Sequence, residues 1–202
     1  MRLNHYISYI FHPIVFPFFG TLFYFFVLPK YISERQISFV LITIAVGTIL
    51  LPIVLLFFLK NANMISSFSL PNIEERKYPL LLFSIIGFLI GKLLLKLTLV
   101  NDLAVFIFAG SLGMLVIYAF LWVEKKVSIH ALGIGGFVGF MLYLSYSYSL
   151  NLLLFIALGF VLFGIIANAR LQLKAHNAQE VVYGFVIGVG LQLLFPNLLF
   201  II

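Results

Sequence analysis

Cysteine is absent from the 202-residue chain, and charged residues make up only 9% of it. Without cysteine, disulfides, a thiol nucleophile and cysteine-ligated metal sites are excluded. Acidic residues are scarcest, with six Asp and Glu against twelve Lys and Arg, and hard divalent cations need several oxygen ligands. The net charge of +6 is modest, and no basic amphipathic arm accompanies it. We therefore expect contact with anionic lipids and no nucleic-acid partner.

Hydrophobic residues, in contrast, make up 64% of the chain, and the mean hydropathy is +1.22. Apolar runs long enough to cross a bilayer, about 20 residues each, recur along it. We predict an all-α fold, a polytopic transmembrane helix bundle of about six or seven spans. Residues 1–202 would form a single integral membrane domain, and no cleavable signal peptide is expected. The expected spans are residues 10–28, 37–59, 79–97, 103–122, 128–146, 151–169 and 180–202.

Local signals set some of the expected boundaries. Pro52 predicts a kink in the second span, and Pro79 suits the first turn of the third. Asp102 is placed to cap the fourth span, and Asn151 opens the sixth. Glycines recur at four-residue spacing in three spans, which indicates close helix packing within the bundle. The pairs are Gly87 and Gly91, Gly135 and Gly139, and Gly184 and Gly188.

Three charged clusters should meet at one end of this bundle, because successive connections alternate between the two membrane faces. Ionisable groups at the membrane edge are costly and are therefore functional candidates. If the last helix starts near Lys174, His176 and Glu180 share one of its faces, and the carboxylate can hold the imidazole tautomer. The clusters are Glu75, Arg76 and Lys77; Lys126, Ser128 and His130; and Arg170, Lys174, His176 and Glu180.

These residue types suit a phosphoryl group better than a metal ion. Zinc takes three or four His, Cys or carboxylate ligands, and neighbouring cations would repel it. Arg and Lys neutralise phosphate oxygens, while one histidine can attack phosphorus and another can protonate the leaving oxygen. Taken alone, His130 would be a polar residue at a helix start and Arg170 a snorkelling end residue. The prediction of a phosphoryl-binding site therefore depends on these residues occurring together.

The order and spacing of these residues resemble the signatures of the type 2 phosphatidic acid phosphatase superfamily. The best match, to the third signature, is Arg170, His176, Glu180 and Gly184. The segment Val127-Ser128-Ile129-His130 is similar to the second signature, Pro-Ser-Gly-His. The first signature is matched more loosely by Glu75-Arg76-Lys77-Tyr78-Pro79, without the family's upstream lysine. The resemblance covers a core of about residues 60–195 and leaves an extra N-terminal span or spans, residues 10–59, outside it.

The resemblance implies a role for each matching residue. His176 would be a nucleophile that forms a phosphohistidine, Glu180 would orient it, and His130 would be the general acid. Ile129 stands where the family has a glycine that lets backbone approach phosphate. The implied phosphate-binding residues are Arg170, Arg76 and Ser128, with Lys77 in place of the missing lysine.

The expected function is a metal-independent membrane phosphatase, without cofactor, that hydrolyses a lipid phosphate monoester or pyrophosphate. Substrate candidates are phosphatidic acid, phosphatidylglycerophosphate, a polyprenyl pyrophosphate and a lipid A phosphate. The alternative is a catalytically weak or inactive lipid-phosphate binder or membrane-complex subunit, which a cavity blocked by Ile129 would favour. A small transporter would need a polar path through the bilayer midplane, and no paired broken helices with central charges indicate one.

The expected location is the inner (plasma) membrane, in a multi-pass arrangement. Eight of the twelve Lys and Arg lie on the cluster face, which the positive-inside rule would place in the cytoplasm. The resemblance implies an extracytoplasmic site, and we expect that side. Outside the clusters, Lys92 and Lys96 should snorkel, and His5 and His12 are not expected to be catalytic.

Overall fold

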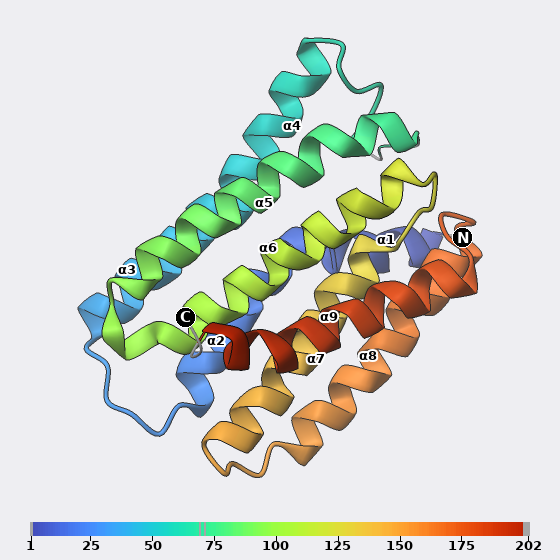
Figure 1. Cartoon of the computed structure of the whole chain (residues 1–202). Coiled ribbons are helices and arrows are strands. Elements are labelled where there is room, and N and C mark those ends of the chain that lie inside the picture. Colours follow the sequence, from blue (N-terminus) through green and yellow to red (C-terminus); the bar gives the residue numbers. More distant parts are fainter. Residues whose placement is uncertain (1, 69, 71, 200–202) are drawn as a thin grey trace.

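The computed structural model describes residues 2–68, 70 and 72–199, and every regular element in that part of the chain is a helix. Seven helical segments are long and apolar enough to cross a membrane, so the predicted all-α, multi-pass bundle is confirmed (Figure 1). The helices are α1 (Arg2–Ile10), α2 (Phe16–Val27), α3 (Glu34–Ala45), α4 (Leu51–Asn61), α5 (Ile73–Leu95), α6 (Asn101–Trp122), α7 (Ile129–Ser147), α8 (Leu153–Gln172) and α9 (Ala178–Leu199).

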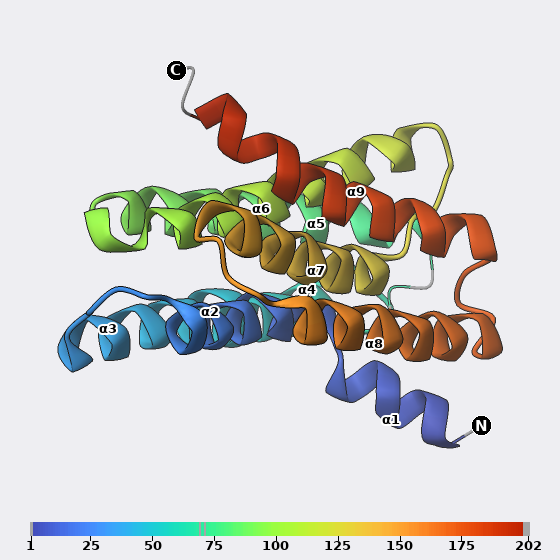
Figure 2. The same ribbon diagram turned by 90° about the horizontal axis from the view of Figure 1, so that it is seen from below.

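The first span differs most from the prediction, because it begins at Arg2 and is broken in two. Helix α1 closes with a hydrogen bond from Phe11 N–H to Ile7 O. His12 is then extended, and Pro13 starts a 3-10 turn (Pro13–Val15) that leads into α2. Figure 2 shows α1 leaving the bundle at an angle to α2. Hydropathy alone misses α1, because its mixed polar and apolar residues do not form a continuous apolar run.

The second span contains an irregular segment directly before Pro52. Helices α3 and α4 are joined by a π-helical turn, Val46–Leu50, which is closed by a hydrogen bond from Leu51 N–H to Val46 O. A π turn adds one residue to the usual repeat and is a recognised cause of helix bending. Pro52 follows at the start of α4, where its missing N–H removes no hydrogen bond of that helix.

The prediction that Pro79 starts the third span is wrong. Helix α5 begins at Ile73 and contains Pro79 in its interior. Glu74 and Glu75 occupy its first turn, where negative charge favours a helix N-terminus. This extension matters for the site, because it places Arg76 on a helix and not in a loop.

Asp102 is not the helix cap predicted from the sequence, since the N-cap position of α6 is Val100. Its carboxylate instead accepts hydrogen bonds from three tyrosine hydroxyls, at 2.8 Å from Tyr143, 2.6 Å from Tyr148 and 3.2 Å from Tyr24. These tyrosines come from α2, the end of α7 and the turn after it. Asp102 therefore ties three parts of the bundle together at the end away from the charged clusters.

Glycines allow α7 and α9 to pack with their backbones in contact. A Cβ atom at Gly184 would lie 2.4 Å from Ser128 O, and one at Gly135 would lie 2.4 Å from Phe185 O. Gly139 and Gly188 meet backbone atoms of the opposite helix in the same way. The predicted role of these glycines, packing inside the bundle, is confirmed, and the contact brings the start of α9 against the start of α7.

Candidate functional site

The predicted clusters lie at one end of the bundle, as the count of spans required. The connections from α4 to α5, α6 to α7 and α8 to α9 all emerge at the end where the N-terminus lies (Figure 1). Ser128, at the start of α7, donates its backbone N–H to the carbonyl of Glu180 in the first turn of α9, at 3.0 Å. This bond, together with the glycine contact at Gly184, fixes the second cluster against the third. We call this region the charged end.

The turn that carries His176 is shaped by the C-terminus of α8. Lys174 adopts a left-handed conformation with φ of 51°, its N–H bonds to Leu171 O, and the N–H of Ala175 bonds to Arg170 O. This pair of bonds is a Schellman motif, which ends a helix and reverses the chain. Arg170 therefore stays on the last turn of α8, while His176 enters the loop facing the start of α9.

His176 and Glu180 are in direct contact, at 2.6 Å between Nδ1 and Oε2. The His176 side chain is only 3% exposed. Asn177 caps α9 by accepting the Glu180 N–H at 2.9 Å, and its amide donates to Glu180 Oε1 at 3.2 Å. An ionised carboxylate can only accept a hydrogen bond, so Nδ1 carries the proton and Glu180 holds His176 in the tautomer whose Nε2 carries the lone pair.

Two arginines from different helices lie close to this pair. Arg76 of α5 is buried, and its Nε donates to Leu70 O at 2.9 Å. Arg170 of α8 donates from Nη1 to the hydroxyl of Ser8 at 3.2 Å. Its Nε is buried and has no hydrogen-bond partner among the described residues. A buried N–H left without an acceptor is costly, so Arg170 is a donor ready for an added oxygen.

Burial lowers the pKa of His176, the hydrogen bond with Glu180 opposes this shift, and the positive charges of Arg76 and Arg170 lower the pKa further. The imidazole is therefore neutral at neutral pH, as a nucleophile or base must be. These influences also show that both arginines are near enough to act on His176, although α5 and α8 are far apart in the sequence.

His130, in the first turn of α7, is turned toward the N-terminal helix. Its Nε2 lies 3.2 Å from the backbone carbonyl of Ser8, and because a carbonyl can only accept, Nε2 carries the proton. The ring also packs edge to face against His12, with centroids 5.5 Å apart. Arg170 and His176 are near enough to interact electrostatically with His130, so the predicted acid and the predicted nucleophile belong to the same charged end.

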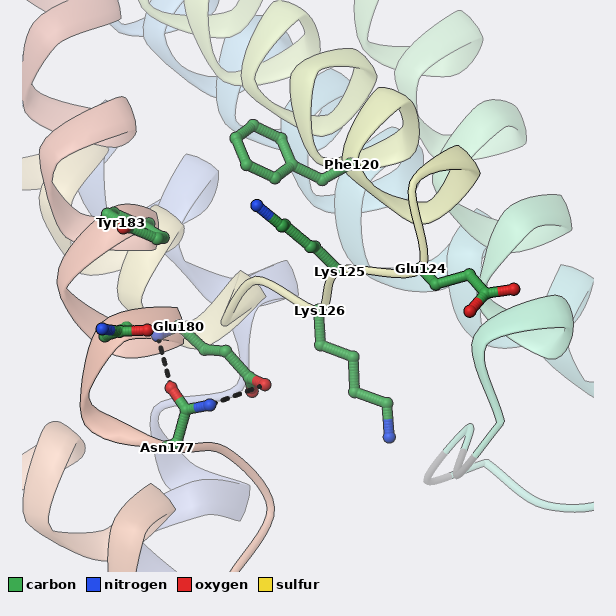
Figure 3. Close-up of a pocket in the computed structure, with 8 residues that line it drawn as sticks. Phe120, Glu124, Lys125, Lys126, Asn177, Glu180 and Tyr183 are labelled. Carbon is green, nitrogen blue, oxygen red and sulfur yellow. Dashed lines mark hydrogen bonds between the residues drawn. The ribbon is translucent and has the colours of Figure 1, made fainter.

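Two surface hollows open beside His176 and Glu180. The hollow between α6 and α9, of about 400 Å³, is lined by Phe120, Glu124, Lys125, Lys126, Asn177, Gln179, Glu180 and Tyr183 (Figure 3). The His176 hollow, of about 360 Å³, is lined by Lys126, Leu171, Lys174, Ala175, His176, Asn177 and Glu180. Neither is lined by His130, Arg76 or Arg170. Ile129 lines neither hollow and packs against the apolar group around Leu80 and Leu121, so it does not block them.

The other two predicted phosphate-binding residues have local roles in this structure. Ser128 is the N-cap of α7, and its buried hydroxyl accepts the N–H of Ala131 at 3.3 Å. The Lys77 ammonium bonds to Glu74 at 2.7 Å and lies over the Trp122 ring at 4.5 Å. Lys77 is thus held against α6 and neither hollow includes it.

Four residues at the charged end were missed as site members by the sequence analysis. Ser8 and His12 come from the first span, which lies outside the resemblance, so no motif indicated them. Lys126 and Lys174 were recognised as cluster residues without a role, yet both line the hollow beside His176. A signal was available for His12, because histidine within an apolar span is unusual.

The described part of the chain contains no group of three His, Cys, Asp or Glu side chains arranged to hold a metal ion. Comparison of the sequence with family models and with curated proteins, and of the structure with solved structures, finds no match. The geometry of the charged end is therefore the basis on which a function can be proposed.

Proposed function

We propose that this multi-pass membrane protein is a metal-independent phosphatase that hydrolyses a lipid phosphate through a phosphohistidine at His176. The observation that carries the proposal is the 2.6 Å contact between His176 Nδ1 and Glu180 Oε2, with two arginines close by. A neutral histidine held by a carboxylate on one nitrogen presents the other nitrogen as a nucleophile. Cations around it stabilise the charge that develops on phosphate oxygens.

The chemistry can be written in two displacement steps. His176 Nε2 attacks phosphorus, the ester P–O bond breaks, and His130, protonated on both ring nitrogens when the phosphate is bound, gives a proton to the departing lipid oxygen and becomes neutral. Water then attacks the phosphohistidine, its proton passes to His130, and the N–P bond breaks to release phosphate. Glu180 stabilises the positive charge on the His176 ring, and Arg170 and Arg76 bind the phosphoryl oxygens.

A lipid substrate fits the surroundings of the site. The charged end lies where the spans leave the apolar region, so a phosphate there can remain joined to an acyl or prenyl chain in the bilayer. Lys126 and Lys174 line the hollow beside His176, where they can attract an anionic headgroup. We place the protein in the inner (plasma) membrane with this site on the extracytoplasmic face.

A second candidate, a lipid-phosphate binder without turnover, is favoured by one observation. Arg170 and His130 line neither hollow, and both are engaged by Ser8. A protein fixed in this arrangement could hold a headgroup at the lysines without bringing it to both arginines and both histidines.

The two candidates are separated by phosphate release from purified protein in lipid nanodiscs. A panel of phosphatidic acid, phosphatidylglycerophosphate, a polyprenyl pyrophosphate and a lipid A phosphate would be tested with and without EDTA. We expect release from at least one lipid, unchanged by EDTA and abolished in His176→Ala. Equal release by the variant would refute the role of His176, and headgroup binding without release would identify the binder.

A further inference from the structure

Helix α1 reaches the candidate site through Ser8. The Ser8 hydroxyl accepts from Arg170 Nη1, and the Ser8 carbonyl accepts from His130 Nε2, both at 3.2 Å. One residue from outside the core bundle thus engages the proposed phosphate clamp and the proposed general acid together. In this arrangement, the proton that His130 carries on Nε2 points at a protein carbonyl and not at a substrate.

Helix α1 packs on α8 but lies at the edge of the bundle. None of its residues is buried, and Leu3, Tyr6, Tyr9 and Ile10 are each more than 60% exposed. Near the break, only Ile7 and Phe11 pack against the apolar group around Ile134 and Ile166. The exposed apolar and tyrosine side chains form one face that can lie against lipid. Lipid can therefore accommodate α1 in more than one position.

A hinge for such movement lies directly after α1. Phe11 ends the helix, and His12 is extended with φ of −62° and ψ of 140°. Pro13 then begins a separate turn, so no continuous helical hydrogen bonding joins α1 to α2. Figure 2 shows α1 as an arm that departs from the layers formed by the other helices.

The hydrogen bonding of Arg170 gives a physical reason for a phosphate to replace the Ser8 hydroxyl. It has one contact to a neutral hydroxyl and one buried N–H, at Nε, without a partner among the described residues. A phosphate oxygen pair satisfies two N–H groups of a guanidinium at once and bears the opposite charge. Charge-assisted bonds of this kind are stronger than the bond to a serine hydroxyl.

We propose that Ser8 is the resting occupant of the Arg170 clamp, that a phosphate group displaces it, and that α1 is therefore a lid hinged at Phe11 and His12. The inference rests on the proposed function only in taking phosphate as the ligand. Displacement of Ser8 frees Arg170 Nη1 for the phosphate and frees the Nε2 proton of His130 for the leaving oxygen. The lid thus couples phosphate binding to the freeing of His130 from the Ser8 carbonyl.

The first test measures binding of inorganic phosphate by ³¹P NMR to the full-length protein in nanodiscs. Ser8→Ala removes the competing hydroxyl, so binding should tighten by roughly 10- to 100-fold, the range that a hydrogen bond from a charged donor represents. Asn4→Ala is the matched control, because Asn4 lies one turn earlier on the same half-buried face of α1. It should leave the affinity unchanged. Equal or weaker binding by Ser8→Ala would overturn the lid proposal.

The second test follows the position of α1 directly. The chain has no cysteine, so Tyr9→Cys and Tyr146→Cys provide the two positions for spin labels, at residues that are 80% and 90% exposed. Saturating inorganic phosphate should change the distance distribution between the labels, and Ser8→Ala should change it without phosphate. An unchanged distribution while phosphate binds would refute the lid alone. Failure of phosphate to bind, or binding indifferent to Arg170→Lys, would refute the proposed clamp and the lid together.

Discussion

The contact of Gly184 with Ser128 makes a prediction about architecture that needs no assumption about substrate. In Gly184→Ala the new Cβ would lie 2.4 Å from Ser128 O, 3.1 Å from the Ala131 Cβ and 3.2 Å from Leu132 N. The nearest of these is a backbone oxygen, which cannot rotate away as a side chain can. Ordinary contact begins at 3.4 Å, so α9 must move by about 1 Å from α7 in a close-packed interior.

The expected cost of this movement is ~1–3 kcal/mol of unfolding free energy, the usual range for overpacking. Activity should fall more steeply, because a displacement of about 1 Å in a catalytic group can reduce a rate by ~100-fold. The movement would stretch the bond from Ser128 N–H to Glu180 O, which currently measures 3.0 Å, and so would separate His176 and Glu180 from His130.

The matched control is Gly190→Ala on the same helix, where a new Cβ meets nothing within 4 Å. This variant should be unchanged or up to about 1 kcal/mol more stable, because alanine is the better helix former. Unfolding of both variants would be followed by circular dichroism during titration with SDS in one detergent. Equal stabilities of the two variants would refute the backbone contact as the feature that positions α9.

Three further predictions follow from named contacts. Glu180→Gln should lower kcat by ~10²–10⁴, because an amide can hold either imidazole tautomer; a kcat within twofold of wild type would contradict this. Activity needs neutral His176, and burial lowers the pKa of this side chain, so the acid limb of kcat/KM should lie below the ordinary histidine value of 6.5. Because the hydrogen bond with Glu180 raises the His176 pKa, the limb should move to still lower pH in Glu180→Gln. A move to higher pH would contradict this coupling. Asp102→Asn should lower the unfolding free energy by ~2–4 kcal/mol and Tyr143→Phe by about half as much, since hydrogen bonds to a charged group are each worth ~1.5–3 kcal/mol. A larger loss of stability in Tyr143→Phe than in Asp102→Asn, measured by SDS titration, would count against the tyrosine network.

Much of the fold could be predicted from the sequence, because apolar runs report on membrane spans directly. The count of spans was correct, and with it the prediction that three separated clusters share one end. The boundaries were less accurate where local signals compete. Pro79 predicts a helix start, although Glu74 and Glu75 set the start of α5 earlier. The position of Asp102 predicts a helix cap, although its carboxylate accepts hydrogen bonds from tyrosines that lie 41 and 46 residues further along the chain.

The site was predictable only where its residues are neighbours in sequence. The pairing of His176 with Glu180 follows from four-residue spacing near a helix start, and the distance of 2.6 Å agrees with that expectation. Ser8 could not be predicted, because its contacts with His130 and Arg170 span 122 and 162 residues and depend on the break at His12. The position of Lys77 depends on Trp122, a partner on another helix that no local pattern reveals.

The most direct test of the account is to trap the covalent intermediate. Purified protein in nanodiscs would be mixed with ³²P-labelled phosphatidic acid, or with whichever lipid of the panel is turned over. The reaction would be quenched in alkali, in which phosphohistidine survives, and the modified peptide identified by mass spectrometry. We predict one phosphoryl group on His176, absent in His176→Ala and longer-lived in Glu180→Gln. Turnover without a phosphohistidine, or a phosphoryl group on any other residue, would contradict the account.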